Sequence, residues 1–128
     1  MPLKIKRIYE PAEPSDGIRI LVDRLWPRGI SKGRARIDEW MKEIAPSTEL
    51  RTWYHHDPAR WEEFLGRYKE ELATPECEEL LARLGSASAH QTVTLLFSSR
   101  EEQRNNAVAL QLMLKARQPR KRRGRRAK

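Results

Sequence analysis

Three stretches of the chain have the hydrophobic patterning of β-strands. Residues Leu3–Tyr9 alternate apolar and basic side chains with one irregularity, which predicts a strand with one exposed face. Residues Ile18–Val22 are mostly aliphatic and predict a second, more buried strand. Residues Thr92–Phe97 form a nearly continuous apolar run, which is typical of a central strand covered on both faces.

Capping residues and helical spacing predict short helices between the second and third strands. Ser31 precedes a helical turn through Arg36, and Ser47 or Thr48 caps another short helix. The segment Ile37–Ile44 is ambiguous, because its apolar residues keep helical spacing although the run is short. The pattern alone favours a helix there.

Two longer amphipathic helices are predicted between residues 58 and 85. The first begins at Pro58, after the capping residue Asp57. Thr74 and Pro75 start the second, which we expect to end at Gly85, with SASAHQ as a loop. The apolar faces of the two helices consist of Trp61, Phe64, Leu65, Tyr68, Leu80, Leu81 and Leu84.

A last helix is predicted from Glu101 to about Arg117, immediately after the third strand. The side chains expected to face the core are Val108, Leu110, Leu112, Met113 and Leu114. Strands that alternate with helices predict an α/β layer architecture, and 128 residues suit one domain with a modest core. The link Glu10–Gly17 is too short for a helical crossover, so the strand order stays open.

The positive charge of the chain is concentrated at one end. The formal net charge is +8, and eight of the 26 Lys and Arg residues lie in residues 117–128, which contain no acidic residue. Residues 1–116, the predicted α/β domain, are therefore formally neutral. We expect residues 117–128 to be a disordered basic tail, because it has almost no apolar side chains to bury. Such a tail either makes weak, salt-sensitive contacts with nucleic acid or serves only to solubilise the chain.

Other features limit the class of protein. No apolar run reaches the roughly 18 residues of a membrane-spanning helix, and the first residues lack the apolar core of a secretory signal. We therefore expect a cytoplasmic protein without a membrane partner. The single cysteine, Cys77, excludes an internal disulfide and a multi-cysteine metal site. The sequence leaves the oligomeric state open.

Polar residues that could bind a ligand or take part in catalysis follow two of the predicted strands. Asp23, Arg24, Trp26 and Arg28 come after the second strand, within VDRLWPRG. The residues after the third strand are Ser98, Ser99 and Arg100, followed by Asn105 and Asn106 in the predicted helix. Ligands in open α/β sheets bind outside the carboxyl ends of the strands, so both groups are candidates for one site.

Each residue type suits an anionic ligand. Arg24, Arg28 and Arg100 offer planar forks of donors for phosphate or carboxylate, and Trp26 offers a face for stacking. Ser98 and Ser99 add hydroxyl groups to the predicted binding site, next to the free amides of the Glu101 helix. The predicted catalytic or orienting groups are Asp23, Asn105 and Asn106. The alternative is structural: Asp23 pairs with Arg24 or Arg28 to tie the loop to the sheet, and Trp26 covers the core.

Metal and cofactor sites have little support. His55 and His56 are adjacent, so they rarely point the same way, and no Cys or Glu lies at zinc spacing from them. They either take part in proton transfer or end the helix before Asp57. The glycine-rich phosphate loops of nucleotide enzymes are absent, so we expect no cofactor.

Three blocks of sequence carry a resemblance to a known family. RILVDRLWPRGISK, DEWMKEIAPSTELRTWYHHDPARWEEF and TVTLLFSSREEQRNNAVAL occur in this order. On these blocks the chain resembles domain-of-unknown-function family 488, in its YeaO-like branch, over residues 4–114. The resemblance implies a small Rossmann-like α/β domain of three layers, with a mostly parallel sheet of about four strands. It also implies that Ile37–Ile44 is a strand.

The resemblance bears on chemistry as well. Family members carry an Asp-x-Arg block with proline after a strand, which matches Asp23 to Arg28 here. Many also carry a cysteine after the last strand and Cys-His-Arg near the next helix, where this chain has Ser98-Ser99 and Arg104-Asn105-Asn106. Thiol chemistry is therefore not implied for this chain.

These observations leave three hypotheses. The first is a pocket for a small phosphorylated or nucleotide-like ligand, with or without catalysis. A second is a nucleic-acid-associated accessory protein, in which the same arginines and the tail contact backbone phosphates. The third is a partner-binding domain without a small ligand.

Overall fold

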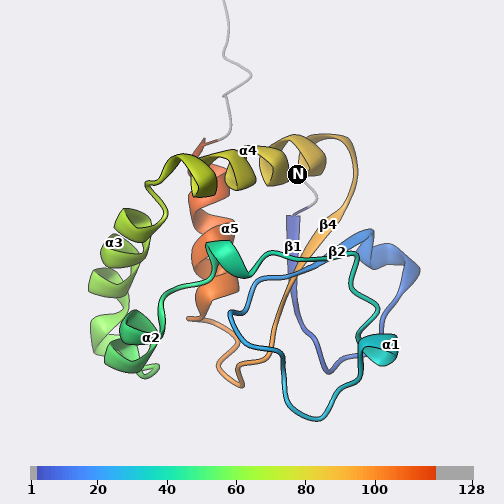
Figure 1. The fold of residues 1–128 in the computed structure, drawn as a ribbon, viewed down its shortest axis with the longest axis horizontal. Coiled ribbons are helices and arrows are strands. Elements are labelled where there is room, and N and C mark those ends of the chain that lie inside the picture. Colours follow the sequence, from blue (N-terminus) through green and yellow to red (C-terminus); the bar gives the residue numbers. More distant parts are fainter. Residues whose placement is uncertain (1–2, 118–128) are drawn as a thin grey trace, which may run out of the picture.

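The computed structural model describes residues 3–117, which fold around one parallel β-sheet (Figure 1). The four strands are β1 (Leu3–Arg7), β2 (Ile18–Leu21), β3 (Glu39–Trp40) and β4 (Val93–Phe97). Their order is β1-β4-β2-β3, and all neighbouring pairs are parallel. β4 is buried along its whole length between β1 and β2, as its continuous apolar run predicts. The predicted α/β class with a parallel sheet of four strands is confirmed.

Four helices cover one face of the sheet. They are α2 (Thr48–Tyr54), α3 (Trp61–Glu71), α4 (Pro75–His90) and α5 (Asn106–Arg117). Successive side chains of a strand point to opposite faces, so Ile20, Leu95 and Phe97 join the large apolar core under these helices. The opposite face is covered by the short α1 (Lys32–Ala35) and neighbouring loops, around a smaller cluster that contains Leu21 and Leu96 (Figure 1). The molecule thus has three layers.

Short 3₁₀ turns complete the backbone, at Pro14–Asp16, Lys42–Ile44 and Pro58–Arg60. Several predicted caps are confirmed: the side chains of Ser31, Ser47, Asp57 and Thr74 each accept a hydrogen bond from a backbone N–H of the following turn. No helix in the described residues is long and apolar enough to cross a membrane.

The segment 37–44 follows the family resemblance more closely than its own periodicity. Glu39 and Trp40 pair with β2, and the Met41 N–H extends the ladder by donating to the Leu21 carbonyl oxygen at 2.9 Å. The helix predicted from apolar spacing is therefore wrong over the strand, and only Lys42–Ile44 is helical, as a 3₁₀ turn. The open edge of β2 offers backbone partners that local periodicity does not register.

Two helix boundaries differ from the prediction. α4 does not end at Gly85 but continues to His90, and the small residues of SASAHQ lie in the helix up to that point. The last helix begins at Asn106 and not at Glu101. The Glu101 carboxylate accepts hydrogen bonds from the N–H groups of Gln103 and Arg104, which lowers the pKa of Glu101 and holds the chain in a turn.

The last helix also differs in its buried face and its end. Leu110 and Leu114 are buried as predicted, whereas Leu112 is 47% exposed and the small Ala107 and Ala109 are buried in its place. Arg117 is the final residue of α5 and forms an ion pair with Glu78 at 2.7 Å, although the sequence groups it with the basic tail. The rest of the predicted disordered tail lies outside the described residues.

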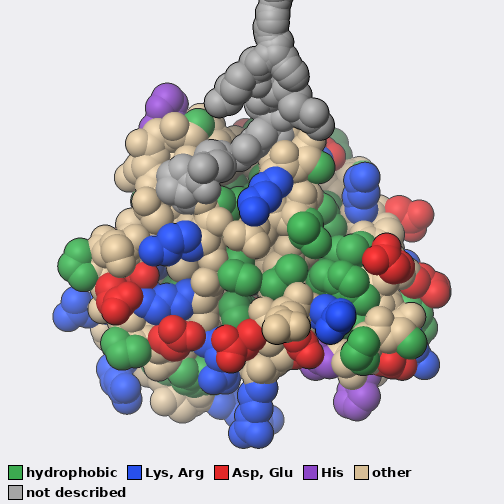
Figure 2. Space-filling view, turned by 180° about the vertical axis from the view of Figure 1, so that it is seen from behind, with side chains coloured by type: hydrophobic (Ala, Val, Ile, Leu, Met, Phe, Trp, Pro, Cys, Tyr) green, Lys and Arg blue, Asp and Glu red, His purple; other side chains and the backbone are tan. Residues whose placement is uncertain are grey.

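The surface of the described domain mixes the two signs of charge. Seen from behind, acidic and basic side chains alternate around the rim of the molecule, and apolar side chains gather near the centre (Figure 2). This pattern agrees with the formal neutrality of residues 1–116.

A buried charge cluster supports the face of the sheet opposite the helices. Asp16 is 1% exposed and lies 2.5 Å from the Arg19 guanidinium and 3.1 Å from the Lys6 ammonium group. Arg19 also donates to the carbonyl oxygens of Ala35 and Arg36, which fixes the loop that covers this face. Burial opposes ionisation of Asp16, but hydrogen bonds from the Glu13 N–H, Lys6 and Arg19 outweigh it and lower the pKa of Asp16.

Gly17 is required where the chain enters β2. Its φ is +66°, and a Cβ at this position would lie 2.1 Å from the carbonyl oxygen of Thr92. That oxygen accepts the hydrogen bond from the Ile18 N–H that begins the β2–β4 pairing. A larger residue would have to separate the two strands.

We expect Gly17→Ala to lower the free energy of unfolding by about 2–4 kcal/mol, because left-handed strain adds to a backbone clash. Gly66→Ala is the matched control, since Gly66 lies inside α3 and nothing lies within 4 Å of an added Cβ. The control should raise stability by roughly 0.5–1 kcal/mol. Urea denaturation of both variants measures the two changes, and equal midpoints would contradict the expectation.

We expect Asp16→Asn to lower the free energy of unfolding by about 3 kcal/mol at neutral pH, because Arg19 would lose its buried partner. The folded pKa of Asp16 lies below its unfolded value of about 3.9. The stabilisation is therefore fully present above about pH 4 and is lost as pH falls through the folded pKa. Denaturation from pH 7 to pH 2.5 should show the difference between variant and wild type shrink in acid. A difference that stays constant would refute the assignment.

Candidate functional site

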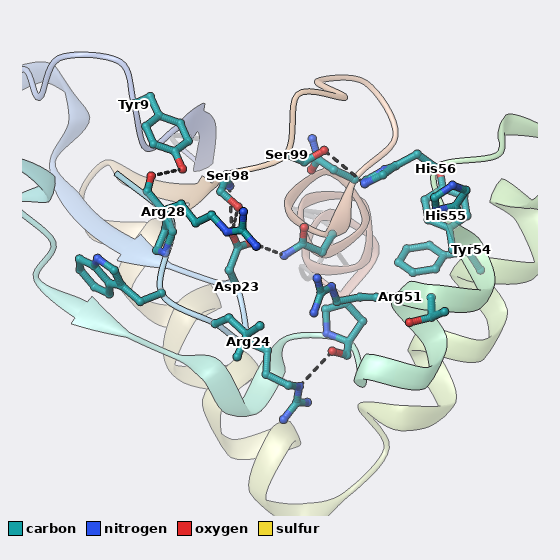
Figure 3. Close-up of a pocket in the computed structure, with 18 residues that line it drawn as sticks. Tyr9, Asp23, Arg24, Arg28, Arg51, Tyr54, His55, His56, Ser98 and Ser99 are labelled. Carbon is teal, nitrogen blue, oxygen red and sulfur yellow. Dashed lines mark hydrogen bonds between the residues drawn. The ribbon is translucent and has the colours of Figure 1, made fainter. Parts of the chain in front are cut away.

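A pocket of about 580 Å³ opens at the carboxyl ends of β2 and β4 (Figure 3). Its volume is within the range of small-molecule sites. Parallel pairing of β2 with β4 brings the polar residues that follow the two strands to the same place. One wall is formed by residues 23–28, and the opposite wall by the second half of α2 with the two histidines after it.

Asp23 lies at the floor of the pocket and connects the elements around it. Its carboxylate accepts hydrogen bonds from the Ser98 N–H at 2.9 Å and the Ser98 hydroxyl at 2.6 Å. Asn106 Nδ2 donates to the other carboxylate oxygen at 3.2 Å and to the Val22 carbonyl oxygen at 2.8 Å. Among the described residues Asp23 has no ion pair with Arg24 or Arg28. The structural network therefore consists of neutral donors.

The two asparagines have different environments. Asn105 is 1% exposed, and its side chain binds the Glu101 carbonyl oxygen and the Val108 N–H. It thus caps α5 and has little capacity left for a ligand. Asn106 is half-buried and lines the pocket; its Oδ1 accepts no hydrogen bond within residues 3–117.

The predicted arginines do not act as one group. Arg24 donates to the carbonyl oxygens of Ala45 and Pro46, at 2.9 Å and 3.1 Å, and so fixes the two segments together. Arg28 is exposed, and its side chain reaches into the pocket from the wall that follows β2 (Figure 3). Arg100 is exposed and does not line the pocket, because the turn at Glu101 carries the chain away after Ser99.

Trp26 has a structural role and also lines the pocket. Its indole N–H donates to the Ile30 carbonyl oxygen at 2.8 Å, and its ring lies edge-on to Trp40 with centroids 5.4 Å apart. It packs against the smaller apolar cluster of the sheet, as the structural alternative requires. The residue also lines the pocket, so the two roles are compatible.

Of the wall contributed by α2, the sequence drew attention only to His55 and His56. Arg51 is exposed on α2, and its side chain points into the pocket from the side opposite Arg28 (Figure 3). Thr52, Tyr54, His55 and His56 complete this wall. Arg51 lies in the short helix predicted after Ser47 or Thr48, but periodicity does not say where a helix docks, so nothing in the pattern placed Arg51 at the pocket.

The two histidines occupy strained backbone. His55 has φ +47° and His56 has φ +54°, a conformation that costs roughly 1–2 kcal/mol per residue for side chains other than glycine. His56 Nε2 lies 3.5 Å from the Ser99 hydroxyl, in an exposed contact between the turn after α2 and the loop after β4 (Figure 3). Consecutive residues of this kind are concentrated at functional sites.

Tyr54 supports this strained turn from the core side. Its ring stacks on Phe64 with centroids 4.4 Å apart, and its hydroxyl donates to the Arg104 carbonyl oxygen at 2.9 Å. Burial, reinforced by the Glu101 carboxylate, raises the pKa of Tyr54 to about 12. The phenol therefore stays neutral and serves as a hydrogen-bond donor.

Neither a metal cluster nor a thiol accompanies the pocket in the part of the chain that the structure describes. Residues 3–117 contain no group of three His, Cys, Asp or Glu side chains placed to hold a metal ion. Cys77 is buried in α4 and does not line the pocket; its Sγ contacts the Glu43 carbonyl oxygen at 3.4 Å.

The chain belongs to the family described as the inactive DUF488-N3 subclade, whose sequence profile matches residues 2–128. It is 48% identical to the uncharacterised protein YeaO of Escherichia coli K12 over 110 residues, which cover 86% of this chain and 94% of YeaO. It is 43% identical to the uncharacterised protein Rv3073c of Mycobacterium tuberculosis H37Rv over 115 residues, 90% of this chain and 95% of that protein. No solved structure matches the chain significantly. The resemblance to the YeaO-like branch is confirmed.

The Asp23–Ser98 contact can be measured by a double-mutant cycle. Asp23→Asn and Ser98→Ala each remove part of the contact, so their destabilisations should not add. We expect a coupling free energy of about 1 kcal/mol or more in urea denaturation. Destabilisations that add within about 0.5 kcal/mol would contradict the role of this contact in joining β2 to β4.

Proposed function

We propose that this domain binds a small phosphate-bearing ligand in the pocket at the carboxyl ends of β2 and β4, and that it does not convert the ligand to a product. The observation that carries the proposal is the charge around the pocket. Three arginines and one carboxylate line it, which gives a formal charge of +2 with the histidines counted as neutral.

Two of these arginines have no partner within the described residues, which supports the binding of an anion from outside the protein. The only carboxylate in the lining, that of Asp23, is engaged by Ser98 and Asn106. The guanidinium groups of Arg28 and Arg51 form no hydrogen bond or ion pair with another described residue. Arginine matches phosphate by paired hydrogen bonds, and an exposed pair on facing walls suits a ligand between them (Figure 3).

Several observations support binding without turnover. The family to which the chain belongs is described as inactive. Ser98 and Ser99 stand where the resemblance puts a cysteine, and both hydroxyls already have partners: Ser98 donates to Asp23, and Ser99 accepts from the Glu101 N–H at 2.9 Å. Of the residues predicted as catalytic, Asp23 and Asn106 are hydrogen-bonded to each other at the floor of the pocket and Asn105 caps α5, which supports a positioning role for them.

Removal of either exposed pocket arginine tests the proposal. We expect inorganic phosphate and adenosine monophosphate to stabilise the wild-type protein in thermal-shift experiments, by about 2.7 kcal/mol at a hundred times the Kd. Arg28→Ala and Arg51→Ala should each weaken binding about 10- to 100-fold, as expected for a lost charged hydrogen bond. Titration calorimetry measures the affinities.

Arg34→Ala is the matched control, because Arg34 is exposed on α1 and does not line the pocket. It should bind like the wild type. No stabilisation by either phosphate compound would contradict the proposal. Binding of duplex DNA that falls steeply with salt and is lost when residues 118–128 are removed, without stabilisation by either small phosphate compound, would favour the nucleic-acid hypothesis instead.

A further inference from the structure

The polar groups of the pocket are separated by type. The groups nearest the floor, on Asp23, Ser98 and Asn106, are partly buried and present mainly acceptor oxygens. The groups on the walls, Arg28 and Arg51, are exposed and can only donate. A ligand that fills the pocket therefore meets acceptor oxygens near the floor and two guanidinium donors on the walls, beside His55, His56 and Ser99.

The side-chain oxygens of Asp23 and Asn106 at the floor can accept further hydrogen bonds. An ionised carboxylate has about four lone-pair sites, and Asp23 receives three hydrogen bonds. Asn106 uses its Nδ2 twice as a donor, to Val22 and Asp23, which fixes its Oδ1 as the remaining free acceptor. These oxygens repel a phosphate group and favour hydroxyl or amine hydrogens.

The total charge of the pocket lining indicates whether the ligand places a hydroxyl or an amine group at the floor. The lining has a formal charge of +2, and a phosphate monoester carries about −1.5 to −2 at neutral pH. An otherwise uncharged ligand therefore balances the pocket, whereas an added ammonium group would leave a positive excess. The volume of about 580 Å³ leaves room for a polyol behind the phosphate.

We propose that the ligand is a phosphate monoester of a polyhydroxylated molecule, such as a sugar phosphate or the ribose phosphate of a nucleotide, with its hydroxyl groups against Asp23 and Asn106 and its phosphate between Arg28 and Arg51. This inference rests on the proposed function, because it assigns an orientation within the same pocket. The hydroxyl groups should add affinity that phosphate alone does not have.

A series of ligands on the wild-type protein tests the orientation. Calorimetry compares inorganic phosphate, methyl phosphate, glycerol 3-phosphate, ribose 5-phosphate and ethanolamine phosphate. We expect ribose 5-phosphate to bind at least about tenfold more tightly than methyl phosphate, since each hydroxyl gains a hydrogen bond. Asn106→Leu should reduce this ratio toward one, and Arg34→Ala should leave the ratio unchanged.

The outcomes separate the two proposals. If methyl phosphate and ribose 5-phosphate bind equally well to the wild type, the pocket binds phosphate and the assigned orientation is wrong. Tighter binding of ethanolamine phosphate than of ribose 5-phosphate also overturns it, in favour of an amine at Asp23. If none of the phosphates binds, the proposed function fails together with the inference. Because the series is measured on the wild type, the test does not depend on the folding of Asn106→Leu.

Discussion

The Asp23 carboxylate is the interaction on which the arrangement of the pocket depends. It follows β2 directly, and its partners lie after β4 and in the first turn of α5, so one side chain joins three elements. These partners are a backbone amide, a hydroxyl and a carboxamide, none of which carries a charge. An ion pair between Asp23 and Arg28 would leave the net charge of the lining at +2 but would occupy the Arg28 guanidinium group. Because neutral donors meet the carboxylate, that guanidinium group stays free of an ion pair with it.

On the opposite face of the sheet, the buried charges are compensated by ion pairs. There Asp16 is bound directly by Lys6 and Arg19, and Arg19 continues to the carbonyl oxygens of the covering loop. Removing one partner of such a cluster leaves a buried charge without compensation, so the cluster holds the thin third layer in place. Arg24 acts in a similar way beside the pocket, where it fixes residues 45 and 46. Arg19 and Arg24 thus hold backbone segments in place, whereas the guanidinium groups of Arg28 and Arg51 make no such contacts and line the pocket.

Sequence patterns predicted the parts of the structure that depend on local contacts or on sheet geometry. Continuous apolar residues identified β4, and the rule that parallel strands share a carboxyl edge brought Asp23 and Ser98 to one site. The patterns did not predict the docking of α2, because helical periodicity identifies a buried face and not its neighbour. They placed the start of α5 too early, because Glu101 looks like a helix residue but captures the backbone amides of a turn. Arg100 was assigned to the pocket because it follows β4, and it does not line the pocket, whereas Arg51 does.

The strained turn at His55 and His56 forms part of the pocket wall. Two consecutive left-handed residues oppose folding, and asparagine or glycine would relieve the strain. The strain is local to the wall that carries Arg51, and Tyr54 anchors that wall by stacking on Phe64 and bonding to Arg104. A left-handed residue is a common helix end, and Arg36 ends α1 in the same way, so the two histidines by themselves do not indicate a ligand. α2 carries Arg51 on the side of the pocket opposite Arg28, and this facing pair is the feature that a phosphate group would use under the proposed function.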